Sequence, residues 1–330
     1  MTVSPPARRF LIWALRLLLL IAVVLGVGHT FQSALARIQD HDWQLRPAWL
    51  AASGALYILG LLPLAWLWKR LLTAFGQTVP WRELLNAYFL GHLGKYVPGK
   101  ALVVVLRVGA IRHWLASTWS AVISIVLETL LMMAVGTFLA ATMSTLSLPL
   151  ERGMIALAIA IAAGTIVCTL PPVVRAVGNA RLLRFRFNRR NDGNQALDPD
   201  KSKTNDSQAN QLVSTITWRL WAEGWIASLL CWMLFGLSLW AVLRAIGVDS
   251  VHAIADLPHM IATVSLAVVA GFISFLPGGL VVRDALLLEL LTPTCGEASA
   301  LVAAVLLRLV WLVSEILVCG IMVIGTFRRR

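Results

Sequence analysis

Long runs of apolar residues, separated by short polar loops, dominate the chain. About six of these runs reach the roughly 20 residues that a helix needs to cross about 30 Å of hydrocarbon. The first run resembles the apolar core of a signal peptide, but it is longer and contains Arg16, so we interpret it as a retained span. The predicted full spans lie near residues 10–28, 48–68, 116–141, 153–173, 218–243 and 298–327.

Two further apolar segments, residues 84–112 and 257–292, are interrupted in the middle by a proline followed by glycine. The interruptions have the sequences YVPGK and FLPGG, and neither half of either segment is long enough to span a bilayer alone. We therefore expect two re-entrant or broken helix pairs. Such a break leaves backbone N–H and C=O groups unpaired, so it must face protein or water and not hydrocarbon. The predicted breaks are Pro98, Gly99, Pro277, Gly278 and Gly279.

The composition agrees with this pattern, since 59% of the 330 residues are hydrophobic and 13% are charged, against about 25% charged in an ordinary globular protein. No segment is polar and long enough to form a separate soluble domain. We therefore predict an all-α, polytopic membrane protein in which residues 1–330 form a single membrane domain. The formal charge of +12 lies mainly in loops beside apolar runs, which indicates membrane topology and not nucleic-acid binding.

The distribution of basic residues predicts the orientation. Arg8 and Arg9 precede the first span and residues 328–330 are all arginine, so both termini are expected in the cytoplasm. The segment 175–217 begins with several arginines and continues into a polar stretch, so we predict a cytoplasmic, basic and partly disordered loop. These assignments of the termini and loops to the two sides of the membrane agree with one another only if each broken segment enters and leaves the membrane on the same side.

The resulting order of elements predicts an internal repeat. A first repeat at residues 10–141 and a second at 153–327 each contain two spans, one broken segment and one more span, and they cross the bilayer in opposite senses. Secondary transporters use this inverted repeat and place their substrate sites at the broken helices.

Several charged residues fall inside the predicted membrane segments. Each would cost about 2.5–3.5 kcal/mol at the centre of a span, so they should face the protein interior. We predict one buried network in which three acids balance Arg283 and Arg308 and serve charge balance or proton coupling. The alternative is a static set of ion pairs that holds helices together. The acids are Glu128, Asp284 and Glu315.

The half-helices that begin at the two breaks direct the positive ends of their dipoles toward the breaks, which favours an anion such as phosphate. Five basic residues could add charge to such a site. The sequence shows no metal-ligand spacing, nucleotide-binding loop or catalytic motif, so we expect no metal, no cofactor and no enzymatic activity. The candidate anion-binding residues are Lys95, Lys100, Arg107, Arg283 and Arg308.

Three segments resemble the lysylphosphatidylglycerol synthase transmembrane region family, the flippase-like domain of the multiple peptide resistance factor. They are GHLGKYVPGKALVVVLRVGAI at 91–111, AGFISFLPGGLVVRDALLLELL at 270–291 and ALVAAVLLRLVWLVSEIL at 300–317. The resemblance extends over about residues 10–327. It departs from the family pattern at three positions: Val281 stands in place of glycine, Asp284 in place of glutamate, and Thr129 in place of an arginine.

The resemblance implies that the protein moves or binds a lipid with a charged or glycosylated head group in a bacterial cytoplasmic membrane. Phospholipids and polyprenyl phosphates are the implied classes, and the basic residues named above would bind the head group. Two-domain members carry a soluble aminoacyl-transferase domain after the membrane part. Because this chain ends at Arg330, we do not expect lysine transfer, and a separate synthase or glycosyltransferase could supply the lipid.

Two other functions are compatible with the sequence. The protein could be a membrane enzyme, or an accessory subunit of one, in polyprenyl, hopanoid or phospholipid metabolism. It could also be a scaffold whose arginine-rich segment at 175–190 binds anionic lipid or another protein.

Overall fold

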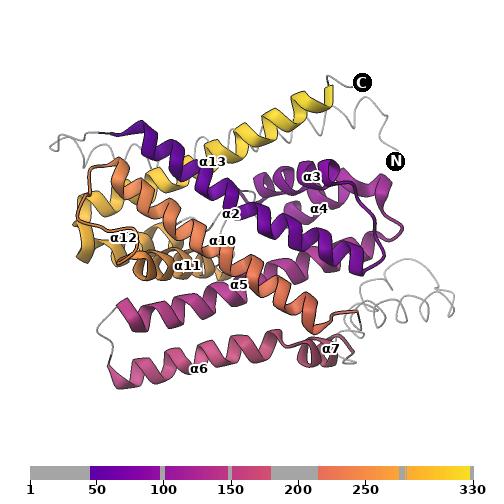
Figure 1. Cartoon of the computed structure of the whole chain (residues 1–330), viewed down its shortest axis with the longest axis horizontal. Helices are drawn as coiled ribbons and strands as arrows, with labels where there is room; N and C mark the ends of the chain where they lie inside the picture. The colour runs from indigo at the N-terminus through magenta and orange to yellow at the C-terminus, as the bar shows by residue number, and fades with distance from the viewer. Residues whose placement is uncertain are drawn as a thin grey trace.

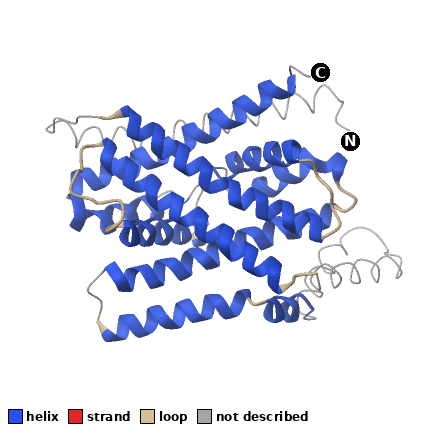
Figure 2. Ribbon diagram, in the orientation of Figure 1, coloured by secondary structure: helices blue, strands red, loops and turns tan. Residues whose placement is uncertain are grey.

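The computed structural model describes residues 45–96, 101–147, 151–179, 215–274, 279 and 281–327. Every regular element within these ranges is a helix, which confirms the all-α class (Figure 2). Several predictions fall outside the described residues. They are the first span at 10–28, the break residues Pro98, Gly99, Pro277 and Gly278, the candidate Lys100, and residues 180–214 of the predicted loop.

Five helices in the described part of the chain are long and apolar enough to cross a membrane. Their positions agree with five of the predicted full spans to within a few residues at most ends, which confirms a polytopic membrane protein. Proline stands at the first position of the earliest of them, where a helix does not need its N–H. The five are α2 (Pro47–Ala74), α5 (Thr118–Ser147), α6 (Arg152–Thr169), α10 (Trp218–Ala245) and α13 (Glu297–Phe327).

Each of the two broken segments forms a pair of short helices that pack against one another. The first hairpin consists of α3 (Trp81–Leu93), which continues into a short 3-10 turn at Gly94–Tyr96, and α4 (Ala101–Ile111). The second consists of α11 (Leu257–Ile273) and α12 (Val282–Cys295). At 1.5 Å per residue these helices are about 16 to 26 Å long, so none spans 30 Å of hydrocarbon alone.

Helices α2 and α10 run antiparallel through the centre of the molecule (Figure 1). Arg46 before α2 pairs with Asp249 after α10 at 2.8 Å, and Arg70 near the other end of α2 pairs with Glu223 at 2.9 Å. The long helix that follows each hairpin packs on the other hairpin, because α5 contacts α11 and α13 contacts α3. The inverted repeat stays a prediction. In such a repeat the helix after each hairpin would occupy an equivalent position, as α5 and α13 do in these contacts.

One boundary differs from the prediction. Helix α6 ends at Thr169, and α7 (Pro171–Asn179) then begins and continues into the segment that we predicted as a loop from residue 175. The cause is local. Pro171 and Pro172 cannot donate the backbone hydrogen bonds that would continue α6, but they are well tolerated in the first turn of a new helix. Figure 1 shows α6 and α7 together at one edge of the molecule.

Candidate functional site

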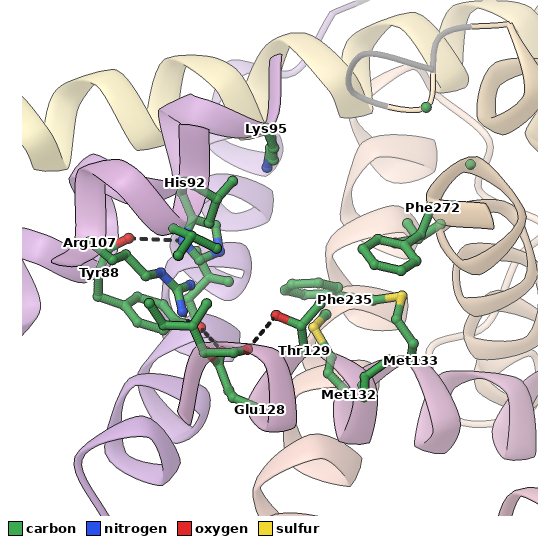
Figure 3. Close-up of a pocket in the computed structure, with 18 of the residues that line it drawn as sticks. Tyr88, His92, Lys95, Arg107, Glu128, Thr129, Met132, Met133, Phe235 and Phe272 are labelled. Carbon is green, nitrogen blue, oxygen red and sulfur yellow. Dashed lines mark hydrogen bonds and ion pairs between the residues drawn. The ribbon is translucent and has the colours of Figure 1, made fainter. Parts of the chain in front are cut away.

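A cavity of about 360 Å³ lies between the inner ends of the two hairpins. The first hairpin contributes charged, aromatic and valine side chains, and the second contributes a valine, two glycines, a phenylalanine and an arginine. Helices α2, α5, α10 and α13 supply the remaining walls. Figure 3 shows the polar group of Tyr88, His92, Arg107 and Glu128 on one side and the apolar group of Met132, Met133, Phe235 and Phe272 on the other. The lining residues used below are Tyr57, Tyr88, Lys95, Val103, Val104, Arg107, Val126, Glu128, Leu130, Phe272, Gly279, Arg283 and Trp311.

A buried ion pair joins the first hairpin to α5. Arg107 Nη1 of α4 donates to Glu128 Oε2, and both side chains are almost completely buried. Tyr88 Oη of α3 donates to the other oxygen, Oε1, at 3.0 Å. The guanidinium carbon of Arg107 lies 4.1 Å from the centre of the Tyr88 ring. Both carboxylate oxygens of Glu128 therefore already have donors, which stabilises the charge in this apolar environment.

A second ion pair joins the tip of the first hairpin to α13. Lys95 Nζ donates to Glu315 Oε1 and, at 3.0 Å, to Tyr57 Oη, and the Tyr57 hydroxyl in turn donates to Glu315. Glu315 is fully buried, whereas the Lys95 side chain is partly exposed. The side chain of Lys95 is therefore held by a carboxylate that is 220 residues away in the sequence.

A third ion pair joins α13 to the second hairpin, since Arg308 Nη1 donates to Asp284 Oδ2 at 2.7 Å. Arg308 and Glu315 are seven residues apart, or about 10 Å along the helix. Helix α13 thus contacts both hairpins with opposite charges, through Arg308 to the second hairpin and through Glu315 to the first.

Arg283 differs from the other basic residues of the site because it forms no salt bridge within the described residues. It is only 9% exposed, and its Nε and Nη2 atoms have no hydrogen-bond acceptor within the described residues. Its guanidinium carbon lies 4.4 Å from the centre of the Trp311 ring. Trp311 is itself fixed, because it stacks on Tyr57 at 4.3 Å and donates from Nε1 to Ser238 Oγ at 3.0 Å. Trp311 therefore holds the Arg283 guanidinium against a fixed ring at the cavity, where Arg283 has no carboxylate partner within the described residues.

The charges are paired differently from the prediction. We predicted a single network that balances Arg283 and Arg308, but the described residues of the site form three separate pairs, and Arg283 belongs to none of them. Glu128 balances Arg107, because α4 directly precedes α5 in the chain and packs against it. The predicted burial of Glu128, Glu315 and Arg308 is confirmed.

Glycines allow the two arms of each hairpin to approach closely. A Cβ atom at Gly94 would lie 2.8 Å from the backbone nitrogen of Val103, and one at Gly271 would lie 3.1 Å from Cα of Gly279 and 3.2 Å from Cβ of Arg283. Gly279 also has a positive φ of 68°, a conformation that glycine adopts without strain. The position of Arg283 in the cavity therefore depends on two small residues.

Val281 has an unusual backbone conformation, with φ of 69° and ψ of −57° just before α12. A β-branched residue in this region is strained by about 1–3 kcal/mol. This is the position at which the family pattern noted above has glycine. Val281 thus replaces glycine at a position whose positive φ strains any residue with a side chain.

Sequence reasoning missed three aromatic residues of the site, namely Tyr57, Tyr88 and Trp311. The chain has only three tyrosines, and two of them donate to the buried carboxylates. A buried tyrosine hydroxyl needs a hydrogen-bond partner, so a rare tyrosine inside an apolar span was an available signal. Trp311 had no such signal, because the chain contains 14 tryptophans.

Comparison with protein-family models identifies the family of the chain. The family model described as lysylphosphatidylglycerol synthase TM region matches residues 10–319, which include both hairpins and every ion pair of the site. No curated protein matches the chain at a significant level.

Proposed function

We propose, since the chain belongs to the lysylphosphatidylglycerol synthase transmembrane region family, that it moves a lipid with a charged or glycosylated head group between the two leaflets of a membrane. The family supports a role connected with membrane lipids. The observation that carries the finer proposal is a cavity whose inner end is charged and whose outer wall is apolar and exposed.

The apolar wall lies on α5 beside the first hairpin. Val126 and Leu130 of α5 line the cavity and are also 44% and 56% exposed, so the cavity reaches the outer surface of the helix bundle. Leu130 lies about 18 Å from the start of α5, at the depth where a bilayer contains acyl chains. Val103, Val104 and Phe272 continue the apolar lining. A lipid could enter sideways and leave its chains in the bilayer.

The charged end suits a phosphate-containing head group. A guanidinium binds phosphate oxygens through directed, charge-assisted hydrogen bonds. Arg283 lines the cavity, and its buried Nε and Nη2 donors have no acceptor within the described residues. A volume of about 360 Å³ is at the lower end of the range for small-molecule sites, so it accommodates a head group and not a whole lipid.

The ion pairs on α13 offer a route to movement. Within the described residues one salt bridge joins each hairpin to this helix, Lys95 to Glu315 and Asp284 to Arg308. An anionic head group that reaches Lys95 or Arg308 would compete with their carboxylates. Each hairpin would then be released in turn, which is a form of the alternating access used by inverted-repeat transporters.

The distribution of charge supports an orientation. Lys69 and Arg70 lie at the end of α2 that adjoins Glu223, and Asp249 and Asp256 lie at the opposite end of the bundle. By the positive-inside rule we propose that the Arg70 end and both termini face the cytoplasm of a bacterial cell. The lipid itself would come from a separate enzyme.

A bulky residue at the cavity mouth is expected to block lipid movement. We predict that Leu130→Trp lowers the initial rate of lipid flipping in proteoliposomes about tenfold or more, because the added ring fills the opening between α5 and the first hairpin. A tenfold loss corresponds to about 1.4 kcal/mol in the barrier. The measurement is the loss of fluorescence of acyl-labelled phosphatidylglycerol as it becomes accessible to dithionite.

Leu157→Trp is the matched control, since Leu157 of α6 is 61% exposed and does not line the cavity. It should flip lipid at the unmodified rate. Equal rates for Leu130→Trp, Leu157→Trp and the unmodified protein would contradict entry through this mouth.

A further inference from the structure

The charges around the cavity do not cancel. Three basic residues are each neutralised by one acid, whereas Arg283 has no carboxylate partner within the described residues. With histidine neutral, the described part of the site therefore carries one net positive charge. The neutral pairs are Lys95 with Glu315, Arg107 with Glu128, and Arg308 with Asp284.

A site with one excess positive charge in an apolar environment is neutralised by a ligand with one negative charge. A ligand with more or fewer charges would leave a buried charge without a partner. A phosphodiester carries one negative charge at neutral pH. A phosphomonoester carries about 1.5 to 2 negative charges there. The charge of the described part of the site therefore matches a phosphodiester.

The cavity also offers little to a cationic head group. Glu128 is the carboxylate that lines it, and both of its oxygens already accept hydrogen bonds, from Arg107 and from Tyr88. Asp284 and Glu315 are not among the residues that line the cavity. An ammonium group in the cavity would be desolvated without meeting a lining carboxylate oxygen that lacks a donor. The oxygens without a partner within the described residues, Oδ1 of Asp284 and Oε2 of Glu315, belong to residues that do not line the cavity.

We propose that the cavity selects a lipid phosphodiester whose head group carries one negative charge and no ammonium group, with its phosphate on Arg283 and its acyl chains outside the mouth at Val126 and Leu130. This selectivity rests on the proposed lipid-transport function and narrows its substrate class. Trp311 is a positioning residue in this arrangement, since it holds the guanidinium that the phosphate contacts.

The test is native mass spectrometry of the purified full chain with equal amounts of three lipids that share the same acyl chains: phosphatidylglycerol, its lysyl ester and phosphatidate. We expect phosphatidylglycerol to occupy the protein at least tenfold more than either competitor, a difference of about 1.4 kcal/mol. Glycerophosphoglycerol, which has the same phosphodiester without chains, should compete poorly because it lacks the contacts at the mouth.

Two variants test the charge argument itself. Asp284→Asn leaves Arg308 without its carboxylate and raises the net charge of the site by one, so the preference should move toward phosphatidate. Arg283→Gln removes the excess charge and should abolish the preference for phosphatidylglycerol. If Asp284→Asn does not fold, Arg283→Gln and the three lipids on the unmodified protein still decide the question.

The selectivity is overturned if the unmodified protein binds the lysyl ester or phosphatidate as well as phosphatidylglycerol, or if Arg283→Gln retains the preference. In that case flipping of any of these lipids in proteoliposomes would leave the transport proposal intact. Absence of both binding and flipping for all three lipids would overturn both proposals.

Discussion

Replacing Arg283 by methionine is expected to abolish lipid flipping while leaving the protein at least as stable as before. The guanidinium is buried, and its Nε and Nη2 atoms lack acceptors within the described residues. An unpaired buried charge is destabilising, and replacement of buried ionic groups by apolar residues of similar volume is often neutral or stabilising by about 1–4 kcal/mol. The lost contact with Trp311 is worth about 0.5–2 kcal/mol, so the two effects on stability offset each other or favour the variant.

The effect on transport should be large, because the phosphate would lose its cation at the point where it is most desolvated. Loss of one partner from a buried, hydrogen-bonded charge pair costs about 2–5 kcal/mol. A loss of about 3 kcal/mol at the barrier lowers the rate by roughly 100-fold. Flipping in proteoliposomes and thermal unfolding in detergent measure the two quantities on the same preparation.

Arg283→Lys separates charge from geometry. It keeps the positive charge but replaces the planar guanidinium by a point charge, so we expect partial flipping between the rates of the unmodified protein and of Arg283→Met. A stable Arg283→Met protein that flips lipid normally would contradict the assignment of this residue to the head group. An Arg283→Met protein that unfolds would contradict the expectation that this variant is at least as stable as the unmodified protein.

Replacing Arg107 by methionine is expected to have the opposite effect on stability. Arg107 is paired with Glu128 inside the protein, and its removal leaves a buried carboxylate whose one remaining hydrogen bond within the described residues comes from Tyr88. Removal of one member of a buried ion pair costs about 3–5 kcal/mol. We therefore expect a clear decrease in the temperature of thermal unfolding in detergent, or loss of the folded protein on purification.

The double variant Arg107→Met with Glu128→Leu is the matched control for this effect, because it removes both charges together. It should recover most of the lost stability. Arg46→Gln is a second control, since Arg46 pairs with Asp249 on the exposed surface, where ion pairs contribute little. If Arg107→Met unfolds at the same temperature as Arg46→Gln, the Arg107 and Glu128 pair does not hold the first hairpin to α5.

The contrast between these two arginines could not be predicted from the sequence. Both follow a proline and glycine break within ten residues, and both lie in an apolar segment, so sequence reasoning assigned both to the anion site. Their roles depend on what each meets in the folded protein. Arg107 faces Glu128 on the next helix, whereas Arg283 faces an aromatic ring from α13.

The spans and the two helix pairs could be predicted, because the bilayer imposes the length of every apolar helix and because proline and glycine interrupt helices for local reasons. The burial of Glu128 and Glu315 followed from the cost of placing a charge in hydrocarbon. The partner of Glu315 did not follow. Lys95 and Tyr57 reach it only because α13 packs on both α2 and α3, a tertiary contact that helix periodicity does not encode.

The boundary between α6 and α7 illustrates the same limit on a smaller scale. No charged residue stands between α6 and residue 174, and Leu170, Val173 and Val174 are apolar, so a criterion based on apolar runs extends the span to 173. Backbone hydrogen bonding ends the helix at Thr169, because two consecutive prolines follow Leu170. The prolines therefore determine the C-terminal end of α6, which hydrophobicity alone places a few residues too far along the chain.

The most direct measurement of the central claim is the structure of the full chain in a lipid nanodisc that contains phosphatidylglycerol. The account predicts a lipid whose phosphate lies within hydrogen-bonding distance of Arg283, between the inner ends of the two hairpins, with its acyl chains leaving past Val126 and Leu130 of α5. A map in which this space is closed to lipid, with ordered lipids only on the outer surface of the helices, would contradict it.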